Sequence, residues 1–190
     1  KIMQKAKIKT ADFFITIPGE YKTSLSIPIA FPLFIKPVKG GDSRGIDANS
    51  IVYDFLSFKA KVLDIKLKHN SPSLVETYLS GKEYSVGIFE DSTNGNLRAM
   101  PIEIVVKKNM NGHRILDFDV KKDDEETVIA VTDIKIFNKL CKLARISFKA
   151  LGGKSLGRID IKMNHRGIPH FMEANLMPGL RKGYFYRSCM

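Results

Sequence analysis

Near the end of the chain, two stretches alternate between polar and apolar residues, and this pattern constrains the fold more than any other feature of the sequence. In the first stretch Arg158, Asp160 and Lys162 are separated by isoleucines. Neighbouring side chains of a strand point to opposite faces, so these three polar side chains would share one face. Turn residues at 164–167 precede a second strand at 170–175. The pattern predicts an antiparallel hairpin with one polar face.

The two strands of this hairpin bring carboxylates together. A turn at 166–167 sets Asp160 opposite Glu173, and simple alternation places Phe171 and Asn175 on the same face as Glu173. Carboxylates directly across a sheet repel one another unless a cation lies between them. The oxygens of Asp160, Glu173 and Asn175 are ligands that suit Mg²⁺, or Mn²⁺. The other interpretation is an amphipathic hairpin whose polar face lies in water.

A lysine and a glycine-rich loop form a second polar feature. Lys36 ends a buried apolar strand, and Gly40, Gly41 and Gly45 follow it with small polar residues between them. A lysine at this place can pair with phosphate oxygens while loop N–H groups surround the β- and γ-phosphates. A surface turn without function is the alternative. The Walker A pattern is excluded, because Phe148 stands where its first glycine should be.

The remaining segments alternate short strands with single helices. Asp54 can cap a helix with apolar positions at helical spacing and lysines on the opposite face. Thr132 or Asp133 can cap another helix, in which Cys141 belongs to the core. Strands dispersed among single helices indicate an α+β fold with antiparallel sheets. The other expected strands lie within 10–37 and at 74–79, 83–89, 100–106 and 115–120, the last after a hairpin at 109–113; 123–126 is expected to be a solvated loop.

Composition excludes several classes of protein. The chain has 190 residues, enough for one domain or two small lobes. Its longest apolar stretch, 27–35, contains two prolines and is too short for a membrane helix. Two isolated cysteines build neither a disulfide framework nor a zinc site, so we expect a reducing cytoplasm. The net charge of +11 predicts attraction to polyanions such as ATP. Nucleic acid is disfavoured, because no motif of the common RNA-binding modules is present.

Segments along nearly the whole chain resemble the ATP-grasp superfamily and, within it, the D-alanine–D-alanine ligases. The hairpin segments Gly157–Asp160 and Phe171–Leu180 resemble the family's metal hairpin and substrate turn. The family's lysine strand with its phosphate loop is resembled by 34–46, and the hinge that holds adenine and ribose by 74–83. A further strand of the family is resembled by 101–104, and the segment with its second lysine by 117–121.

The resemblance implies an ATP-grasp fold in which two α+β lobes sandwich a nucleotide. The small lobe with the phosphate loop would be 1–79, and the large lobe with the metal site and the substrate turn would be 80–190. The family's amino-terminal substrate domain is absent, and the chain lacks an initiating methionine, so we expect the sequence to start inside a larger protein.

The resemblance also assigns roles to residues. Arg158 and the Gly179 N–H would be catalytic, while Gly179, Leu180 and Tyr184 would lie at the second substrate. Tyr184 falls near the serine with which the family grips that substrate's carboxylate. The implied magnesium ligands are Asp160, Glu173 and Asn175, and the implied ATP contacts are Lys36, Gly41, Ser43, Glu76, Tyr78, Leu79, Glu83, Lys121 and Met172.

The implied activity is ATP-dependent dipeptide synthesis. The carboxylate of one amino acid would attack the γ-phosphate, and the amine of a second would displace phosphate from the resulting acyl phosphate. D-alanyl-D-alanine, a peptidoglycan precursor, is the leading product and another dipeptide the near alternative. We expect ATP and small amino acids as partners, no membrane, and a homodimer as one option. The runner-up is a basic nucleotide- or nucleic-acid-binding module without ligase activity.

Overall fold

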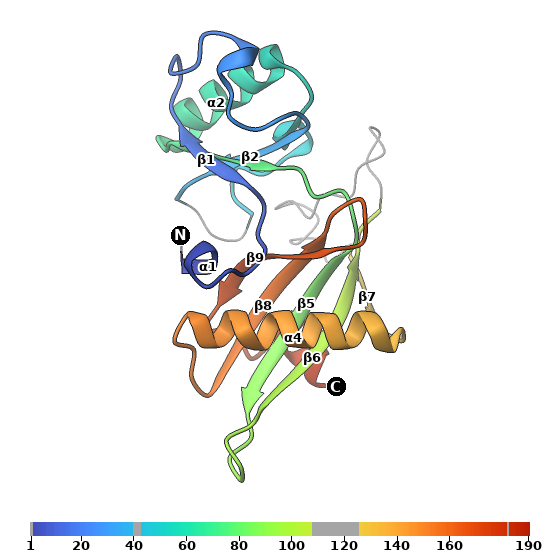
Figure 1. Ribbon diagram of the computed structural model, residues 1–190. Helices are drawn as coiled ribbons and strands as arrows, with labels where there is room; N and C mark the ends of the chain where they lie inside the picture. Colours follow the sequence, from blue (N-terminus) through green and yellow to red (C-terminus); the bar gives the residue numbers. More distant parts are fainter. Residues whose placement is uncertain (1, 40–42, 108–125, 182) are drawn as a thin grey trace. The chain divides into compact units, whose positions relative to one another are not determined.

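The computed structural model describes residues 2–39, 43–107, 126–181 and 183–190 (Figure 1). These residues form two compact units, each described here by itself. Unit 1 consists of the described residues of 1–10, 79–105 and 127–190, and unit 2 of 11–78 with those described between 106 and 126. The chain passes from unit 2 to unit 1 at 78/79, next to the expected lobe boundary at 79/80. Against the expected lobes 1–79 and 80–190, the described residues of 1–10 fall in unit 1 and those of 106–126 fall in unit 2.

The described part of unit 2 is a small antiparallel sheet with a helix on one face. The strand order is β1-β4-β2-β3. The apolar face of the sheet, with Leu33, Ile35 and Val75 fully buried, packs against the helix. The elements of this unit are β1 (Phe13–Thr16), η1 (Ser24–Ser26), β2 (Leu33–Pro37), η2 (Ala48–Ser50), β3 (Ile51–Val52), α2 (Phe55–His69) and β4 (Ser73–Thr77).

Helix α2 begins and ends where its sequence requires. The Asp54 carboxylate accepts a hydrogen bond from the Ser57 N–H at 2.8 Å, and the Ser57 hydroxyl accepts from the Asp54 N–H, which completes a capping box. The helix ends at Asn70 in the left-handed region (φ 45°). The expectation that every lysine of α2 faces solvent is wrong for Lys61, which is buried because two carboxylates pair with it.

Unit 1 is a five-stranded antiparallel sheet with helices on both faces. The strand order is β7-β6-β5-β8-β9. Helix α4 crosses one face (Figure 1), and α5 contacts β5 and β6. The elements are α1 (Ile2–Lys5), β5 (Glu83–Glu90), β6 (Leu97–Val105), β7 (Thr127–Ala130), α4 (Ile134–Ala150), β8 (Leu156–Met163), β9 (Pro169–Asn175) and α5 (Tyr184–Cys189).

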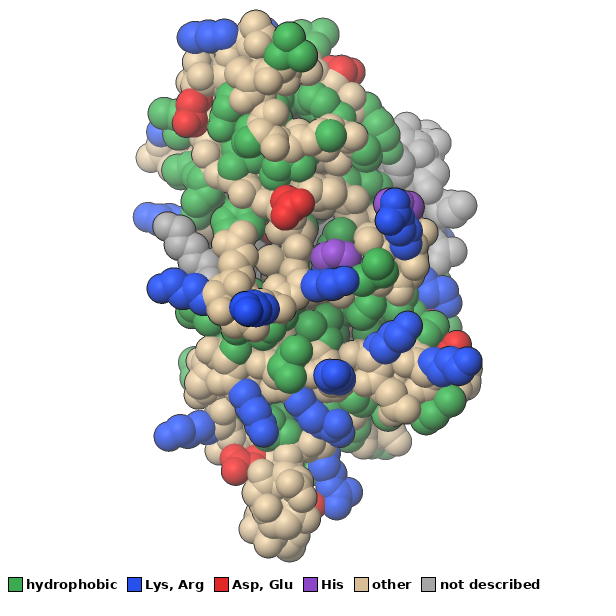
Figure 2. All heavy atoms as spheres, in the orientation of Figure 1, with side chains coloured by type: hydrophobic (Ala, Val, Ile, Leu, Met, Phe, Trp, Pro, Cys, Tyr) green, Lys and Arg blue, Asp and Glu red, His purple; other side chains and the backbone are tan. Residues whose placement is uncertain are grey.

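Helix α4 packs its apolar side against the sheet of unit 1. The Asp133 carboxylate accepts hydrogen bonds from the N–H groups of Lys135 (2.8 Å) and Ile136 (3.1 Å), as expected for a cap. Leu140 and Phe148 are fully buried against the sheet, and Cys141 is core as predicted. Lysine and arginine side chains lie over the outer surface of this unit around α4 (Figure 2). None of the described helices is long and apolar enough to cross a membrane.

The predicted α+β class with mainly antiparallel sheets is confirmed. The expected hairpin at 109–113 and strand at 115–120 lie outside the described residues, as does the expected solvated loop except for Glu126. The short elements α1, β7 and α5 have no counterpart in the sequence prediction.

Candidate active site

The polar residues of the C-terminal hairpin line up with residues of the neighbouring strand. In the register of the sheet, Ser85 of β5 lies opposite Asp160 of β8, which lies opposite Glu173 of β9. Two residues away on each of these strands, Arg158 of β8 lies opposite Asn175 of β9. Directly opposed residues share a face, so these five polar side chains belong to one surface of the sheet. The predicted pairing of Asp160 with Glu173 is confirmed.

A β-bulge corrects one part of the prediction. Between Asp160 and Ile161 the register shifts, and Phe171 rather than Met172 lies opposite Ile161. Met172 is therefore the extra residue on β9. Phe171 packs against the core cluster of α4, so it does not share the face of Glu173, as simple alternation had predicted. The bulge lets an apolar residue reach the core while Glu173 stays on the polar face.

Asp160 is the buried carboxylate of this face. Its Oδ1 accepts hydrogen bonds from Ser85 Oγ (2.7 Å) and Arg158 Nε (3.0 Å), and its Oδ2 accepts one from Arg158 Nη2 (2.8 Å). Burial raises the pKa of Asp160 to about 6, although Arg158 opposes this shift. Burial lowers the pKa of Arg158, but the charges of Asp160 and Glu173 outweigh that effect and leave it raised.

The Arg158 guanidinium lies between the two carboxylates, since its Nη2 is 3.8 Å from Glu173 Oε1. Charge repulsion alone therefore does not require a metal ion here. The side-chain oxygen atoms on this face still fit a magnesium site. Asp160 Oδ2 accepts one hydrogen bond and Asn175 Oδ1 accepts one, from the Met177 N–H at 3.1 Å, so each keeps a lone pair. The Glu173 side chain is 60% exposed.

The donor set is small and consists only of oxygen. Among the described residues no group of three His, Cys, Asp or Glu side chains could hold a metal ion. A cation at this face would depend on two carboxylates, one amide oxygen and oxygens from water or substrate. That set is typical of Mg²⁺, which retains several positions for water and phosphate.

Glu83 and Leu79 occupy different environments in unit 1. Glu83 lies opposite Lys162, and Lys162 Nζ is 2.9 Å from the Glu83 carboxylate, so this predicted ribose contact is engaged in an ion pair. Leu79 is buried. Tyr78, the predicted ATP contact just before Leu79, belongs to unit 2. Its N–H donates a hydrogen bond to the Pro32 carbonyl at 3.1 Å.

Lys36 and Glu76 meet on the face of the unit 2 sheet that points away from α2. Glu76 lies opposite Phe34 of β2, and Lys36 Nζ is 2.7 Å from the Glu76 carboxylate. The Lys36 ammonium also lies 5.9 Å from the centre of the Phe34 ring. The structure therefore brings together one predicted phosphate contact and one predicted adenine contact.

The described part of the glycine-rich loop packs closely against Pro37 and His69 at Gly45. Gly45 has φ +78°, and a Cβ there would lie 2.5 Å from Pro37 Cγ and 2.9 Å from His69 Nε2, so both backbone and space require glycine. Ser43 is also in the left-handed region, at φ 60°. The predicted ligands Gly41 and Lys121 lie outside the described residues.

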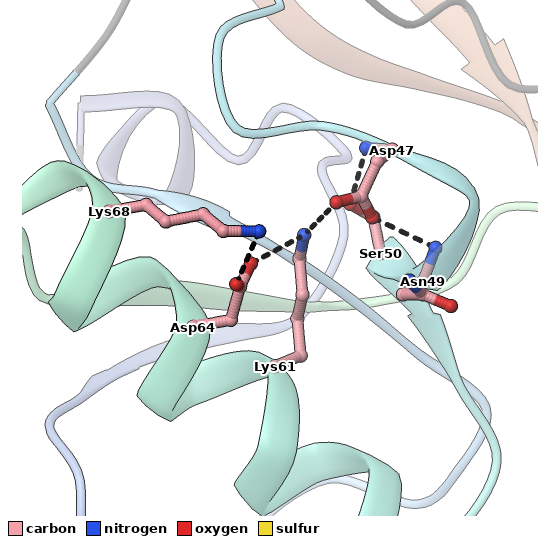
Figure 3. A network of polar contacts seen from close by, with 6 residues as sticks. All are labelled: Asp47, Asn49, Ser50, Lys61, Asp64 and Lys68. Carbon is pink, nitrogen blue, oxygen red and sulfur yellow. Dashed lines mark hydrogen bonds and ion pairs between the residues drawn. The ribbon is translucent and has the colours of Figure 1, made fainter.

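Polar contacts to α2 hold the end of this loop (Figure 3). The Asp47 carboxylate caps η2 by accepting from the Asn49 N–H at 2.8 Å. The same carboxylate receives the buried Lys61 ammonium at 2.9 Å, and Lys61 is 3.7 Å from Asp64. Asp64 in turn pairs with Lys68 at 2.7 Å.

The C-terminal turn leads into a helix that the sequence did not reveal. Gly179 and Leu180 are exposed, and α5 follows them. The ring centre of Tyr184, the first residue of α5, lies 5.5 Å from the Arg158 guanidinium carbon. A helix of six residues is too short to be recognised from periodicity; the spacing of the buried Phe185 and Ser188 is its one signal.

Comparisons with known proteins agree with this architecture. A D-alanine–D-alanine ligase of Geotalea uraniireducens is 27% identical over 180 residues, which cover 93% of this chain and 54% of the relative. The structure of the Bacillus anthracis D-alanine–D-alanine ligase complexed with ATP matches 99% of this chain and 56% of that chain, with a TM-score of 0.72 and 22% identity. The VanG D-Ala:D-Ser ligase of Enterococcus faecalis matches 97% of this chain and 52% of that chain, with a TM-score of 0.72 and 20% identity.

The chain spans about half the length of these relatives. The fold expectation of an ATP-grasp architecture is confirmed. The family model for the "D-ala D-ala ligase C-terminus" matches residues 2–189, nearly the whole chain. The chain therefore belongs to the D-Ala-D-Ala ligase C-terminus family.

Proposed function

We propose that this chain forms the nucleotide-binding and catalytic part of an ATP-dependent carboxylate–amine ligase that joins two amino acids. The observation that carries the proposal is the polar face on which Asp160 lies opposite Glu173 with Arg158 between them. The family membership and the relatives named D-alanine–D-alanine ligase support the same reaction class.

The proposed reaction has two steps. The carboxylate oxygen of the first amino acid attacks the γ-phosphorus of ATP; the bond to the β-γ bridging oxygen breaks, and ADP leaves. The amine of the second amino acid then attacks the acyl carbon, so that a C–N bond forms, the C–O bond to phosphate breaks and the amine loses a proton. Positioned charge is sufficient for both steps, because the nucleophiles belong to the substrates.

Arg158 is the proposed catalytic side chain. Hydrogen bonds to Asp160 fix its guanidinium, which suits it to stabilise negative charge on a transferring phosphoryl group and on the tetrahedral oxyanion. The Gly179 N–H is the proposed second donor to that oxyanion. Asp160, Glu173 and Asn175 are the proposed magnesium ligands, and the ion would neutralise charge on the β- and γ-phosphates.

Two of the proposed ATP contacts, a lysine and a carboxylate, are already engaged in ion pairs. Lys36 is the proposed phosphate contact in unit 2, and its ion pair with Glu76 would have to loosen or reorient when a phosphate arrives. In unit 1, an ion pair with Lys162 holds Glu83 in place, and the Glu83 carboxylate would accept hydrogen bonds from the ribose hydroxyls. The other proposed ATP contacts are Gly41, Ser43, Tyr78, Leu79, Lys121 and Met172.

The proposed product is D-alanyl-D-alanine, with another dipeptide as the near alternative, because one structural relative is named a D-Ala:D-Ser ligase. Gly179, Leu180 and Tyr184 are assigned to the second substrate. We place the reaction in the cytoplasm, where ATP and free thiols are maintained. A homodimer stays a prediction, to be tested by light scattering of the full-length protein.

Phosphate release by the full-length protein, measured with Mg²⁺ and ATP across D- and L-amino acids, tests the proposal. We expect release that depends on an amino acid and is greatest with D-alanine. A nucleotide-binding module without ligase activity would bind ATP but release no phosphate in response to any amino acid. That result would refute the proposed function.

A further inference from the structure

A glycine in the middle of β5 allows helix α5 to lie directly on the sheet. Gly87 has ordinary strand neighbours, but a Cβ on it would collide with Ser188 Oγ and lie 3.5 Å from Phe185 Cδ2. Both contacts come from the buried side of α5. Ser188 is held in turn, because its hydroxyl donates to the Phe185 carbonyl at 2.7 Å. Because Gly87 has no side chain, it leaves a notch in the surface of the sheet, and α5 packs into this notch.

This notch lies beside the proposed catalytic arginine. Gly87 of β5 is directly opposite Arg158 of β8. With α5 seated on Gly87, its first residue, Tyr184, lies with its ring centre 5.5 Å from the guanidinium carbon of Arg158. An aromatic ring within about 6 Å of a guanidinium is attracted to it through the negative face of the ring. The contact is partly shielded from water, since the Arg158 side chain is only 16% exposed.

Two contacts together restrict the orientation of Arg158. Its Nε and Nη2 donate to both oxygens of Asp160, which fixes the guanidinium plane in the manner of a bidentate pair. The Tyr184 ring limits movement of the group away from the sheet. Within the described residues, Nη1 has no hydrogen-bond acceptor, so its donors are available to a ligand.

We infer that Tyr184 is a positioning residue that orders Arg158, and that Gly87 makes this possible by seating α5 against β5. The inference deepens the proposed function and rests on it for its catalytic consequence. This role of the ring is additional to the proposed contact of Tyr184 with the second substrate. The part of Tyr184 that contacts Arg158 is its ring.

The ring and the hydroxyl can be separated by substitution. Tyr184→Phe keeps the ring, so its kcat should stay well above that of Tyr184→Leu. Tyr184→Leu removes the ring and should lower kcat roughly tenfold, with little change in KM for ATP. Tyr186→Leu, on the same short helix but with a more exposed side chain, is the matched control and should leave kcat unchanged. Gly87→Ala should lower kcat as Tyr184→Leu does, because it displaces α5.

A second readout does not depend on turnover. In the NMR spectrum of the full-length protein, the Nε–Hε resonance of Arg158 should shift when Tyr184→Leu removes the ring current, and it should hold its position in Tyr184→Phe. An unchanged resonance in Tyr184→Leu would overturn the inference, as would a Tyr184→Phe variant as slow as Tyr184→Leu. If wild type shows no amino-acid-dependent phosphate release, the proposed function fails, and the resonance still decides whether the Tyr184 ring lies against Arg158.

Discussion

The buried Lys61 of α2 offers a sharp test of how charge is balanced in unit 2. Its side chain is only 3% exposed, whereas its partners Asp47 and Asp64 are 46% and 32% exposed. Water can solvate either carboxylate but not the ammonium. Removing both carboxylates should therefore cost far more than removing the lysine.

The perturbation is the double variant Asp47→Asn with Asp64→Asn. Asparagine keeps the side-chain acceptor that caps η2 at Asn49, so the change is mainly one of charge. Leaving an uncompensated buried charge destabilises a protein by about 3–5 kcal/mol. Lys61→Met, which is similar in volume and neutral, leaves two solvated carboxylates and should cost less than about 1 kcal/mol.

The assay is urea unfolding followed by far-UV circular dichroism. The triple variant, with Lys61→Met added to the two asparagines, should recover most of the lost free energy of unfolding. The reasoning would be refuted by a double variant within about 1 kcal/mol of wild type. It would also fail if Lys61→Met alone were as destabilising as the double variant.

Three further predictions concern the rest of the fold. Burial raises the pKa of Cys141, so Ellman's reagent at pH 8 should react rapidly with Cys189 alone, and two rapid thiols would contradict the core assignment. Hydrogen bonds from the N–H groups of Ile136 and Lys135 hold the pKa of Asp133 below 3.8; its stabilisation is present above that pH and lost as pH falls through the lowered pKa. The melting temperature of wild type should thus fall more steeply below about pH 4 than that of Asp133→Asn, and parallel curves would refute this. Deletion of Met172 removes the bulge but keeps the residue pairs on either side, so thermal unfolding should stay cooperative; a non-cooperative melt would show that the bulge is required.

The sequence predicted the pairing of Asp160 with Glu173 but not the whole register of the hairpin. Alternation put Arg158 and Asp160 on one face, as observed, but the turn alone does not set the partner of Asp160. The pairs next to the turn, such as Lys162 with His170, would place Met172 opposite Asp160, and the bulge brings Glu173 there instead. The bulge could not be predicted, because Phe171 and Met172 are both apolar and either could reach the core. A bulge depends on which side chain packs better against α4, and that is a property of the assembled core.

The features that escaped prediction depend on contacts between distant residues. A lysine in an amphipathic helix is expected to face water, and the reason why Lys61 does not is Asp47, 14 positions earlier in the chain. Helix α5 is too short to be stable by itself and depends on the notch at Gly87. No local pattern connects Gly87 with Tyr184, although both bear on Arg158.

The central claim is that paired carboxylates on the unit 1 sheet support phosphoryl transfer. Its most direct test is amino-acid-dependent phosphate release by the full-length protein carrying Asp160→Asn and Glu173→Gln, compared with the control Asp91→Asn in a turn after β5. The control should keep wild-type turnover and the double variant should release no phosphate above background, because both proposed carboxylate ligands of magnesium are gone. Turnover by the double variant equal to that of the control would contradict the claim.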